Sequence, residues 1–312
     1  MVTAFGVVGD LSLDIVVAQS GPQRFGSDVP AKIRIGPGGQ GANVAVRLAR
    51  QGADARLVAA MADDTPGRLL REALQAERVS LEALEVARST VVLALLDDMG
   101  ERTMFSDRQT LDAAPIADAL AGVGWIHCSG YPLLDDRTGD QLAELLGARA
   151  EGVRLSVAGG SVPGEPARVS RLRLRLAAAR PDLLLLSAEE AESLLGTRPA
   201  SGLTAARSLA GLAPLILVTS GVDGSAAAAG DVELELPAHE LPGPMLDATG
   251  SGDAYLAAAL VTLADATAWP PDAALLEAAM QRGSRLGAEV ARVVGAQGRV
   301  ASEPARGDRV LA

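Results

Sequence analysis

Aromatic residues, cysteine, histidine and lysine are all scarce in this chain of 312 residues. Aromatic side chains make up only 2% of it, so a core has to be built from aliphatic residues, which the 48% hydrophobic content permits. Cys128 is the single cysteine, which excludes an intrachain disulfide and a metal site with several cysteine ligands. His127 and His239 are the only histidines, too few to suggest a zinc site or a histidine-based triad. Lys32 is the only lysine, so arginine supplies nearly all of the positive charge.

The charge balance and the apolar runs argue against two further classes of protein. The formal net charge is -11 and the pI is about 4.8. Such a surface repels a phosphate backbone, so we expect no nucleic-acid partner. No apolar run reaches the roughly 18 residues of a transmembrane helix, and segment 1–10 lacks the basic stretch of a signal peptide. We therefore expect a soluble, cytoplasmic protein with no membrane partner.

Short apolar runs alternate with helical patterns along most of the chain. Continuous apolar strands between helices are typical of a parallel sheet that is covered on both faces. The predicted fold class is α/β, a doubly wound and mostly parallel sheet with helices on both faces, which binds ligands at the carboxyl ends of its strands. The predicted strands are 4–8, 55–60, 124–128, 154–157, 183–186 and 215–218, and the predicted helices are 41–51, 67–76, 136–148, 189–195, 204–210, 252–263 and 273–293.

Two segments break this alternation. Segment 14–35 has strand-like pieces and no helical pattern, and segment 91–105 indicates two strands around a hairpin-like turn at 97–100. One strand and one helix lie between them, so both insertions could come together beside the main sheet. The alternative is that they are ordinary surface hairpins.

Segment 247–253, Asp-Ala-Thr-Gly-Ser-Gly-Asp, is the most informative motif. An apolar run predicts a helix directly after it, so free backbone N–H groups and the positive end of the helix dipole meet at this turn and favour an anion. Gly250 and Gly252 let a phosphoryl group approach the backbone, and a larger side chain at Gly252 is expected to block the anion or strain the backbone. Asp253 would lie beside the anion, which suits phosphoryl transfer to an alcohol. An ordinary helix N-cap with Asp253 as a dipole partner is the alternative.

A second glycine turn, segment 36–41, opens a predicted amphipathic helix. Gly38 and Gly39 can bring the backbone close to a ligand, and Asn43 is a hydrogen-bond donor and acceptor on the first helical turn. Asp14 follows the first strand, where a carboxylate faces the ligand crevice of a parallel sheet. A plain strand-to-helix turn and a turn-forming Asp14 are the alternatives.

These strings resemble the signatures of the ribokinase (PfkB) family of sugar kinases. Segment 247–253 is similar to the family's D-T-x-G-A-G-D and departs only at Ala248 and Ser251, which are both small. Segment 38–43 is similar to G-G-x-G-A-N, and segment 62–67 is similar to G-D-D-x-x-G. The resemblance implies one ribokinase-like kinase domain over 1–312. It also implies lid insertions at about 14–36 and 90–108, which form a small β-sheet over the sugar and often a homodimer contact.

Four shorter segments have a structural and a functional interpretation. Ser187 and Glu190 have the spacing of a capping box, and the family's N-x-x-E for magnesium stands there. Segment 219–224 is similar to T-x-G-x-x-G, which suits a polyphosphate, or is a generic hairpin loop. Segment 100–103 resembles the G-x-R-T of the lid, or is a solvated hairpin. Segment 294–296 resembles the G-A element that frames adenine and often a monovalent cation.

The resemblance implies that ATP donates its γ-phosphoryl group to a hydroxyl of a small sugar, with Mg²⁺ bridging the phosphates. Glu190 would hold magnesium through water, and Asp247 would lie near a monovalent cation such as K⁺. The implied catalytic residues are Asp253 as general base and Ala248, Gly250, Ser251 and Gly252 as the anion hole. The implied sugar-binding residues are Asp14, Gly38, Gly39, Asn43 and Arg102, and the implied ATP-binding residues are Thr219, Gly221, Gly224, Thr249, Gly295 and Ala296.

Three departures from the family pattern leave alternatives open. Ser187 replaces the Asn of N-x-x-E, Ala158 stands where many relatives have Asp or Asn, and segment 128–131 lacks the sugar-contacting Glu of ribokinases proper. Ribose specificity is therefore not supported. A nucleoside kinase of the same family and a sugar or nucleotide sensor without catalysis are the alternatives, and the sequence does not name the sugar.

Overall fold

The main sheet has nine strands in the order β13-β12-β11-β10-β9-β8-β1-β4-β5. Neighbouring strands from β11 to β5 are parallel, and β12 and β13 continue the sheet as an antiparallel hairpin. The computed structural model describes residues 3–19, 21, 26, 28–96, 102–161, 164–240 and 243–303. The strands of this sheet are β1 (Ala4–Val8), β4 (Asp54–Met61), β5 (Ser80–Glu85), β8 (Trp125–Cys128), β9 (Arg154–Ala158), β10 (Leu183–Ser187), β11 (Leu215–Thr219), β12 (Ser225–Ala229) and β13 (Val232–Leu236).

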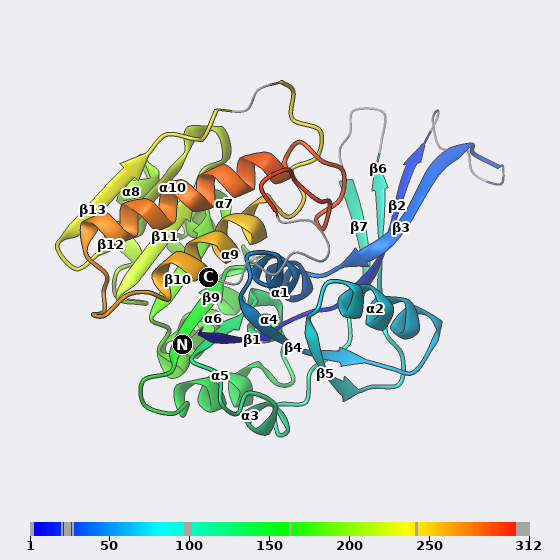
Figure 1. Cartoon of the computed structure of the whole chain (residues 1–312), viewed down its shortest axis with the longest axis horizontal. Coiled ribbons are helices and arrows are strands. Elements are labelled where there is room, and N and C mark those ends of the chain that lie inside the picture. The colour runs from blue at the N-terminus through cyan, green and yellow to red at the C-terminus, as the bar shows by residue number, and fades with distance from the viewer. Residues whose placement is uncertain are drawn as a thin grey trace.

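Helices cover both faces of the main sheet (Figure 1). Successive strand residues point to opposite faces, so Leu215 and Leu217 pack in one core while Ile216 and Val218 pack in the other. One layer holds α1 (Gln40–Arg50), α2 (Thr65–Ala76), α9 (Ser251–Leu263) and α10 (Ala273–Val290). The other holds α3 (Ile116–Ala119), α4 (Gly130–Leu134), α5 (Gly139–Gly147), α6 (Pro166–Ala179), α7 (Ala188–Leu195) and α8 (Gly202–Leu209). None of the described helices is both long and apolar enough to span a membrane.

A separate four-stranded sheet projects from one end of the main sheet (Figure 1). We call it the lid; its order is β3-β2-β6-β7, with β2 (Ser12–Gln19), β3 (Ala31–Gly38), β6 (Thr90–Leu96) and β7 (Arg102–Asp107). The two insertions therefore come together, and the predicted fold class with its small second sheet is confirmed. The predicted turn at 97–100 and the side chain of Arg102 lie outside the described residues.

The predicted elements are all present, but some boundaries differ and several elements were not predicted. Helix α5 begins at Gly139 and not at 136, because Asp135 Oδ1 accepts hydrogen bonds from the N–H groups of Arg137 (2.8 Å) and Thr138 (3.0 Å) and forms a turn there. Helix α10 ends at Val290, three residues earlier than expected. Helix α6, strand β5 and the β12–β13 hairpin are the main elements that the sequence patterns did not indicate.

Candidate active site

The glycine turn before α9 has the backbone of an anion-binding site. Gly250 is the N-cap residue with a φ of 79°, and a Cβ atom there would lie 2.7 Å from the Cβ of Ala296, so only glycine fits. The Ser251 N–H donates to the carbonyl of Ala248 at 3.2 Å and closes the turn. The N–H groups of Gly250 and Gly252 have no hydrogen-bond partner within the described part of the chain, so they remain available to a ligand.

Gly252 differs from the expectation in one respect. Its backbone is ordinary helix, and a Cβ atom there would meet nothing within 4 Å. The idea that a larger residue at Gly252 would strain the backbone is therefore wrong, and the strain belongs to Gly250. The open space in front of Gly252 is consistent with room for an anion.

The two glycine motifs meet at Asp253. The Asn43 side-chain amide donates to Asp253 Oδ2 at 2.8 Å, although 210 positions separate them in the sequence. Gln297 Nε2 in turn donates to Asn43 Oδ1 at 3.1 Å. Asn43 thus orients the Asp253 carboxylate, and Gln297 orients Asn43. The predicted contact of Asn43 with a sugar stays a prediction.

The electrostatic surroundings of Asp253 raise its pKa to about 7. Burial of the carboxyl group is the main cause, and the nearby carboxylate of Asp10 adds to it. The hydrogen bond from Asn43 and the charge of Arg47 act in the opposite direction. A carboxyl group with a pKa near the working pH is well matched to accept a proton.

Asp14 lies at the foot of the lid, where the structure explains Gly38. Ser12 Oγ donates to Asp14 Oδ1 at 2.6 Å, and burial is the main cause that raises the pKa of Asp14. A Cβ atom at Gly38 would lie 2.0 Å from Asp14 Oδ2, so glycine leaves room for the carboxylate. Gly39 is the N-cap of α1 with a φ of 99° and packs against the backbone of Asp10.

Asp10 and Arg108 form a second group of polar side chains near the site. The sequence patterns did not predict this group. Asp10 Oδ1 accepts hydrogen bonds from Gly41 N at 3.2 Å and Ser129 Oγ at 3.3 Å, and Oδ2 pairs with the Arg108 guanidinium at 2.7 Å. The Arg108 guanidinium stacks over the Tyr131 ring, 3.7 Å from its centroid. The position of Asp10 just after the end of β1 could have indicated its place in the site, because ligands bind at that edge of a parallel sheet.

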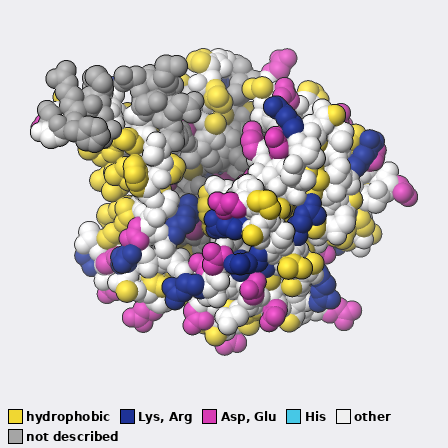
Figure 2. Space-filling model, turned by 180° about the vertical axis from the view of Figure 1, so that it is seen from behind, with side chains coloured by type: hydrophobic (Ala, Val, Ile, Leu, Met, Phe, Trp, Pro, Cys, Tyr) yellow, Lys and Arg dark blue, Asp and Glu magenta, His cyan; other side chains and the backbone are white. Residues whose placement is uncertain are grey.

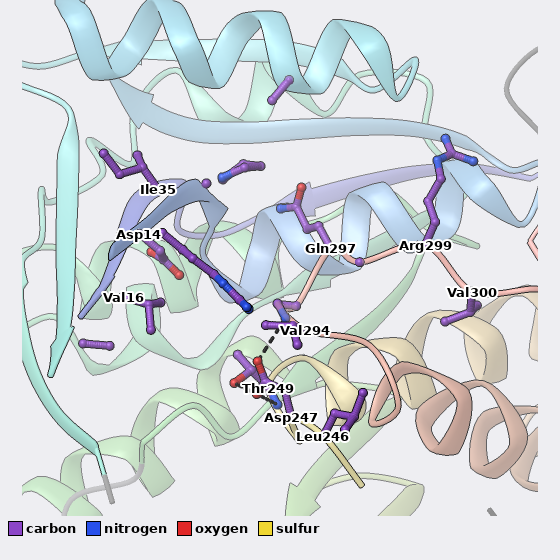
Figure 3. A pocket seen from close by; sticks show the side chains of 18 of the residues that line it. Asp14, Val16, Ile35, Leu246, Asp247, Thr249, Val294, Gln297, Arg299 and Val300 are labelled. Atoms are coloured by element: carbon purple, nitrogen blue, oxygen red, sulfur yellow. Dashed lines mark hydrogen bonds between the residues drawn. The ribbon is translucent and has the colours of Figure 1, made fainter. Parts of the chain in front are cut away.

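Two cavities adjoin these residues. A cavity of about 1040 Å³ lies between the lid and the segments 246–249 and 294–300, and Figure 3 shows Asp14 and Val16 across it from Asp247 and Thr249. A smaller cavity of about 260 Å³ is lined by both apolar and polar side chains. Its polar lining residues include Asp10, Thr90, Arg108, Thr110, Tyr131 and Ser161.

Asp247 connects the start of the glycine turn before α9, segment 247–252, which we call the anion-hole turn for its predicted role, to the loop after α10. Its Oδ1 accepts hydrogen bonds from Thr249 N at 3.0 Å and Thr249 Oγ1 at 2.6 Å, and its Oδ2 accepts one from Gly295 N at 3.0 Å. Ala296, which follows Gly295 in the chain, packs on Gly250. These contacts place Thr249, Gly295 and Ala296 together at the turn. A monovalent cation beside Asp247 stays a prediction.

The segment after β11 lies at the same edge of the sheet, since Thr219 pairs with Ser187 at the ends of neighbouring strands. Thr219 Oγ1 donates to Leu186 O at 3.4 Å, and Gly221 has a φ of 57°. Gly224 has a φ of 92°, and a Cβ atom there would lie 2.1 Å from Leu236 O. The fold therefore explains Gly224 by itself, and ATP contacts of this segment stay predictions.

Glu190 forms the predicted capping box and also faces the site. Ser187 N donates to Glu190 Oε2 at 2.8 Å, and Glu190 N donates to Ser187 Oγ at 3.1 Å. Burial, chiefly, and the negative charges of Asp253 and Glu189 raise the pKa of Glu190 to about 7. Its other oxygen has no hydrogen bond to a described residue.

The residues present fit a magnesium ion that is held mainly by phosphates and water. No group of three or more acidic, histidine or cysteine side chains within the described segments could enclose a metal ion. Magnesium usually keeps several water ligands and binds one or two carboxylates plus substrate phosphates. The open oxygen of Glu190, near Asp253, is suited to bind such a water.

The fold and the site together are those of a phosphotransferase with a small lid sheet beside its main sheet. A family model described as pfkB family carbohydrate kinase matches residues 5–303, and the chain belongs to this family. A fructokinase of Klebsiella pneumoniae is 32% identical over 265 residues, which cover 77% of this chain and 83% of that protein.

Solved structures agree with this assignment. Aminoimidazole riboside kinase from Salmonella enterica, complexed with aminoimidazole riboside and an ATP analog, has a TM-score of 0.73 at 25% identity and covers 94% of this chain and 95% of its own. Ribokinase from Thermotoga maritima has a TM-score of 0.77 at 20% identity, with 97% of both chains covered, which is a likeness of fold. The predicted family and enzyme class are confirmed: the chain is an ATP-dependent kinase of the group that acts on sugars and nucleosides.

Proposed function

We propose that this kinase transfers the γ-phosphoryl group of ATP to a hydroxyl of a small sugar, with Asp253 as the general base. The observation that supports this most is the position of Asp253 on the first turn of α9, beside the available N–H groups of Gly250 and Gly252. Its pKa of about 7 and its hydrogen bond from Asn43 suit proton acceptance in a fixed orientation.

Each part of the chain has a separate task in this proposal. Asp253 takes the proton of the attacking hydroxyl, and the N–H groups of Gly250 and Gly252 stabilise charge on the transferring group. Asp14 and the Gly38–Gly39 backbone hold the acceptor, and the lid excludes water. Glu190 would hold a magnesium-bound water, and the ion, when bound, neutralises charge on the phosphates.

The side chains of the small cavity, beside the proposed acceptor-binding residue Asp14, favour a sugar over a nucleoside as acceptor. A nucleoside base needs an apolar or aromatic surface, whereas the face of Tyr131 in this cavity is covered by Arg108. Asp10 and Arg108 supply the charged hydrogen-bonding groups that a polyol requires. A coupled ADP-release assay over a panel of sugars and nucleosides tests the choice. Faster turnover of a nucleoside than of every sugar would contradict it, and no turnover of any would favour the sensor.

The pH dependence of kcat/KM should reveal the titration of the general base. Since Asp253 has a raised pKa of about 7, it is protonated and inactive below that value, so kcat/KM is expected to fall by about tenfold per pH unit as the pH drops from 7 to 5. Glu190 titrates in the same range, so the profile is compared with that of Glu190→Gln. The acidic limb should persist in this variant, and its disappearance there would assign the limb to Glu190.

We also propose that the lid forms a homodimer contact. Strand pairing places Ile15 beside Ile35 and Leu93 beside Phe105, at positions that alternate with Asp14 across the lid. Ile35 stands on the edge strand β3 and also lines the large cavity. Ile35 and Phe105 are 62% and 57% exposed, and hydrophobic side chains gather on the lid in Figure 2. A sheet face of this kind is commonly buried against a partner.

The oligomeric state tests this contact. Ile35→Arg should convert a dimer to a monomer in size-exclusion chromatography with light scattering, because a buried unpaired charge opposes association. Leu174→Arg is the matched control, since Leu174 is equally apolar and exposed but lies on α6. A monomeric wild-type protein, or a dimer that both variants retain, would refute the lid contact.

A further inference from the structure

A buried arginine on α1 holds the loop that follows α10. Arg47 lies one helical turn after Asn43 and has no exposed side-chain surface. Its Nη1 pairs with Glu303 Oε1 at 2.6 Å, and its Nη2 donates to Ala296 O at 2.7 Å and to Gly298 O at 2.8 Å. Two hydrogen bonds of this buried cation therefore go to backbone carbonyls of segment 295–298, which we call the hub loop.

The hub loop contacts the groups on which the proposed reaction depends: the anion-hole turn and, through Asn43, the proposed base Asp253. Gly295 N donates to Asp247 at the start of the anion-hole turn, and Ala296 packs on Gly250. Gln297 donates to Asn43, which holds Asp253. Figure 3 shows Gln297 on the segment that leads from Val294 to Arg299 along the large cavity. A shift of this loop would move the base and the anion hole together.

A second arginine of α1, Arg50, also binds the hub loop. Arg50 donates to Gln297 O at 2.9 Å and pairs with Glu303 Oε2 at 3.2 Å and with Glu77 Oε2 at 3.0 Å. The carbonyls of Ala296, Gln297 and Gly298 are thus all bound by guanidinium groups of α1. Glu303 and Glu77 fix the direction of these groups.

We propose that Arg47 is a positioning residue for phosphoryl transfer, because its guanidinium fixes the hub loop and the loop fixes Asn43, Asp253 and the anion-hole turn. The inference rests on the proposed function of Asp253. Stability alone is a weaker reason for this ion pair, since both partners together can often be replaced by apolar side chains without loss, whereas removal of Arg47 alone leaves Glu303 buried and should also lower the melting temperature. The charge of Arg47 also favours the ionised form of Asp253.

Arg175 offers a matched control in another part of the fold. It is 3% exposed on α6, its Nε pairs with Asp140 at 2.6 Å, and its Nη1 donates to Leu133 O at 2.7 Å. Like Arg47, it joins a carboxylate and a backbone carbonyl, although Asp140 is 72% exposed whereas Glu303 is buried, and it has no contact with the described segments 247–253 or 291–303. Arg47→Met, Arg47→Lys and Arg175→Met are compared by kcat and both KM values, by thermal melting, and by hydrogen exchange of segments 247–253 and 291–303.

Arg47→Met is expected to lower kcat by roughly tenfold to a hundredfold, the effect of a displacement of about 1 Å at a reacting group, while the KM for ATP changes little. Exchange should rise in both segments. Arg47→Lys should recover part of kcat, because its ammonium group can still donate to a carbonyl. Arg175→Met should melt earlier but keep kcat and the exchange of both segments.

Three results would overturn the inference: an unchanged kcat in Arg47→Met, an equal loss of kcat in Arg175→Met, or unchanged exchange in 247–253. If Arg47→Met does not fold, Arg47→Lys and Glu303→Gln are measured in the same way, and unchanged kcat and exchange in both would overturn it. Failure of the proposed function has a different signature. Asp253→Asn would then keep its turnover, whereas the exchange of 247–253 in Arg47→Met would still report on the hub loop.

Discussion

Asp253→Asn is expected to lower kcat by about 10²–10⁴, the usual contribution of a positioned general base. The asparagine keeps the size of the side chain and can still accept the hydrogen bond from Asn43 through its carbonyl oxygen, so the site should keep its shape. KM for the acceptor should change little, because the lost group acts on the proton and not on binding. Steady-state kinetics with the acceptor identified from the panel provides the measurement.

The stability of the same variant separates lost chemistry from lost structure. Burial raises the pKa of Asp253 in the folded protein, so the protonated form stabilises the fold at low pH and this stabilisation is lost as the pH rises toward 7. Asparagine carries no charge at any pH. Asp253→Asn should therefore be at least as stable as the wild type at pH 8 in urea unfolding. Near-normal turnover in a folded variant would rule Asp253 out as the base.

The glycine turn and the carboxylate of the candidate site were predictable because both are local features of the sequence. A glycine turn before an apolar helix indicates an anion site, and a carboxylate on the first turn indicates a base, so segment 247–253 carries both in seven residues. The glycines at 38 and 39 likewise mark a close backbone approach. The structure adds which glycine needs its unusual backbone, since this depends on Ala296 and not on the motif.

The contacts between motifs could not be predicted, because they join distant segments. Arg47 is only one basic residue on an amphipathic helix until the fold brings Glu303 to it from 256 positions away. Asn43 and Gln297 meet across 254 positions in the same way. Neither pair has a sequence pattern, since polar side chains in helices and loops are usually solvated.

Two elements escaped prediction for reasons of composition. In α6, leucine alternates with arginine over 171–176, a period of two that is typical of a strand, and Leu174 is 71% exposed. Strand β12 is Ser-Ala-Ala-Ala-Ala, whose residues rarely favour strands, yet all five are buried between β11 and β13. Tertiary packing decides its conformation.

Gly252→Val is expected to abolish most nucleotide turnover without loss of the fold. Gly252 has a helical backbone and open space where a Cβ atom would stand, so valine causes no internal clash. Its side chain would instead stand beside the N–H groups of Gly250 and Gly252, where the phosphoryl group is proposed to bind. Removing one donor of this kind typically costs about 10²–10³ in kcat, and we expect a loss of that size with weakened ATP binding in isothermal titration.

Gly250→Ala gives the opposite pattern and serves as the control. Alanine at a φ of 79°, with a Cβ atom 2.7 Å from that of Ala296, should destabilise the protein by about 1–3 kcal/mol in urea unfolding. Gly252→Val should instead keep its unfolding midpoint and circular dichroism spectrum, because valine is no less favourable than glycine in a helix. Unchanged ATP affinity in folded Gly252→Val would show that the anion does not bind at this helix terminus, and the base would then have to be sought elsewhere than on the first turn of α9.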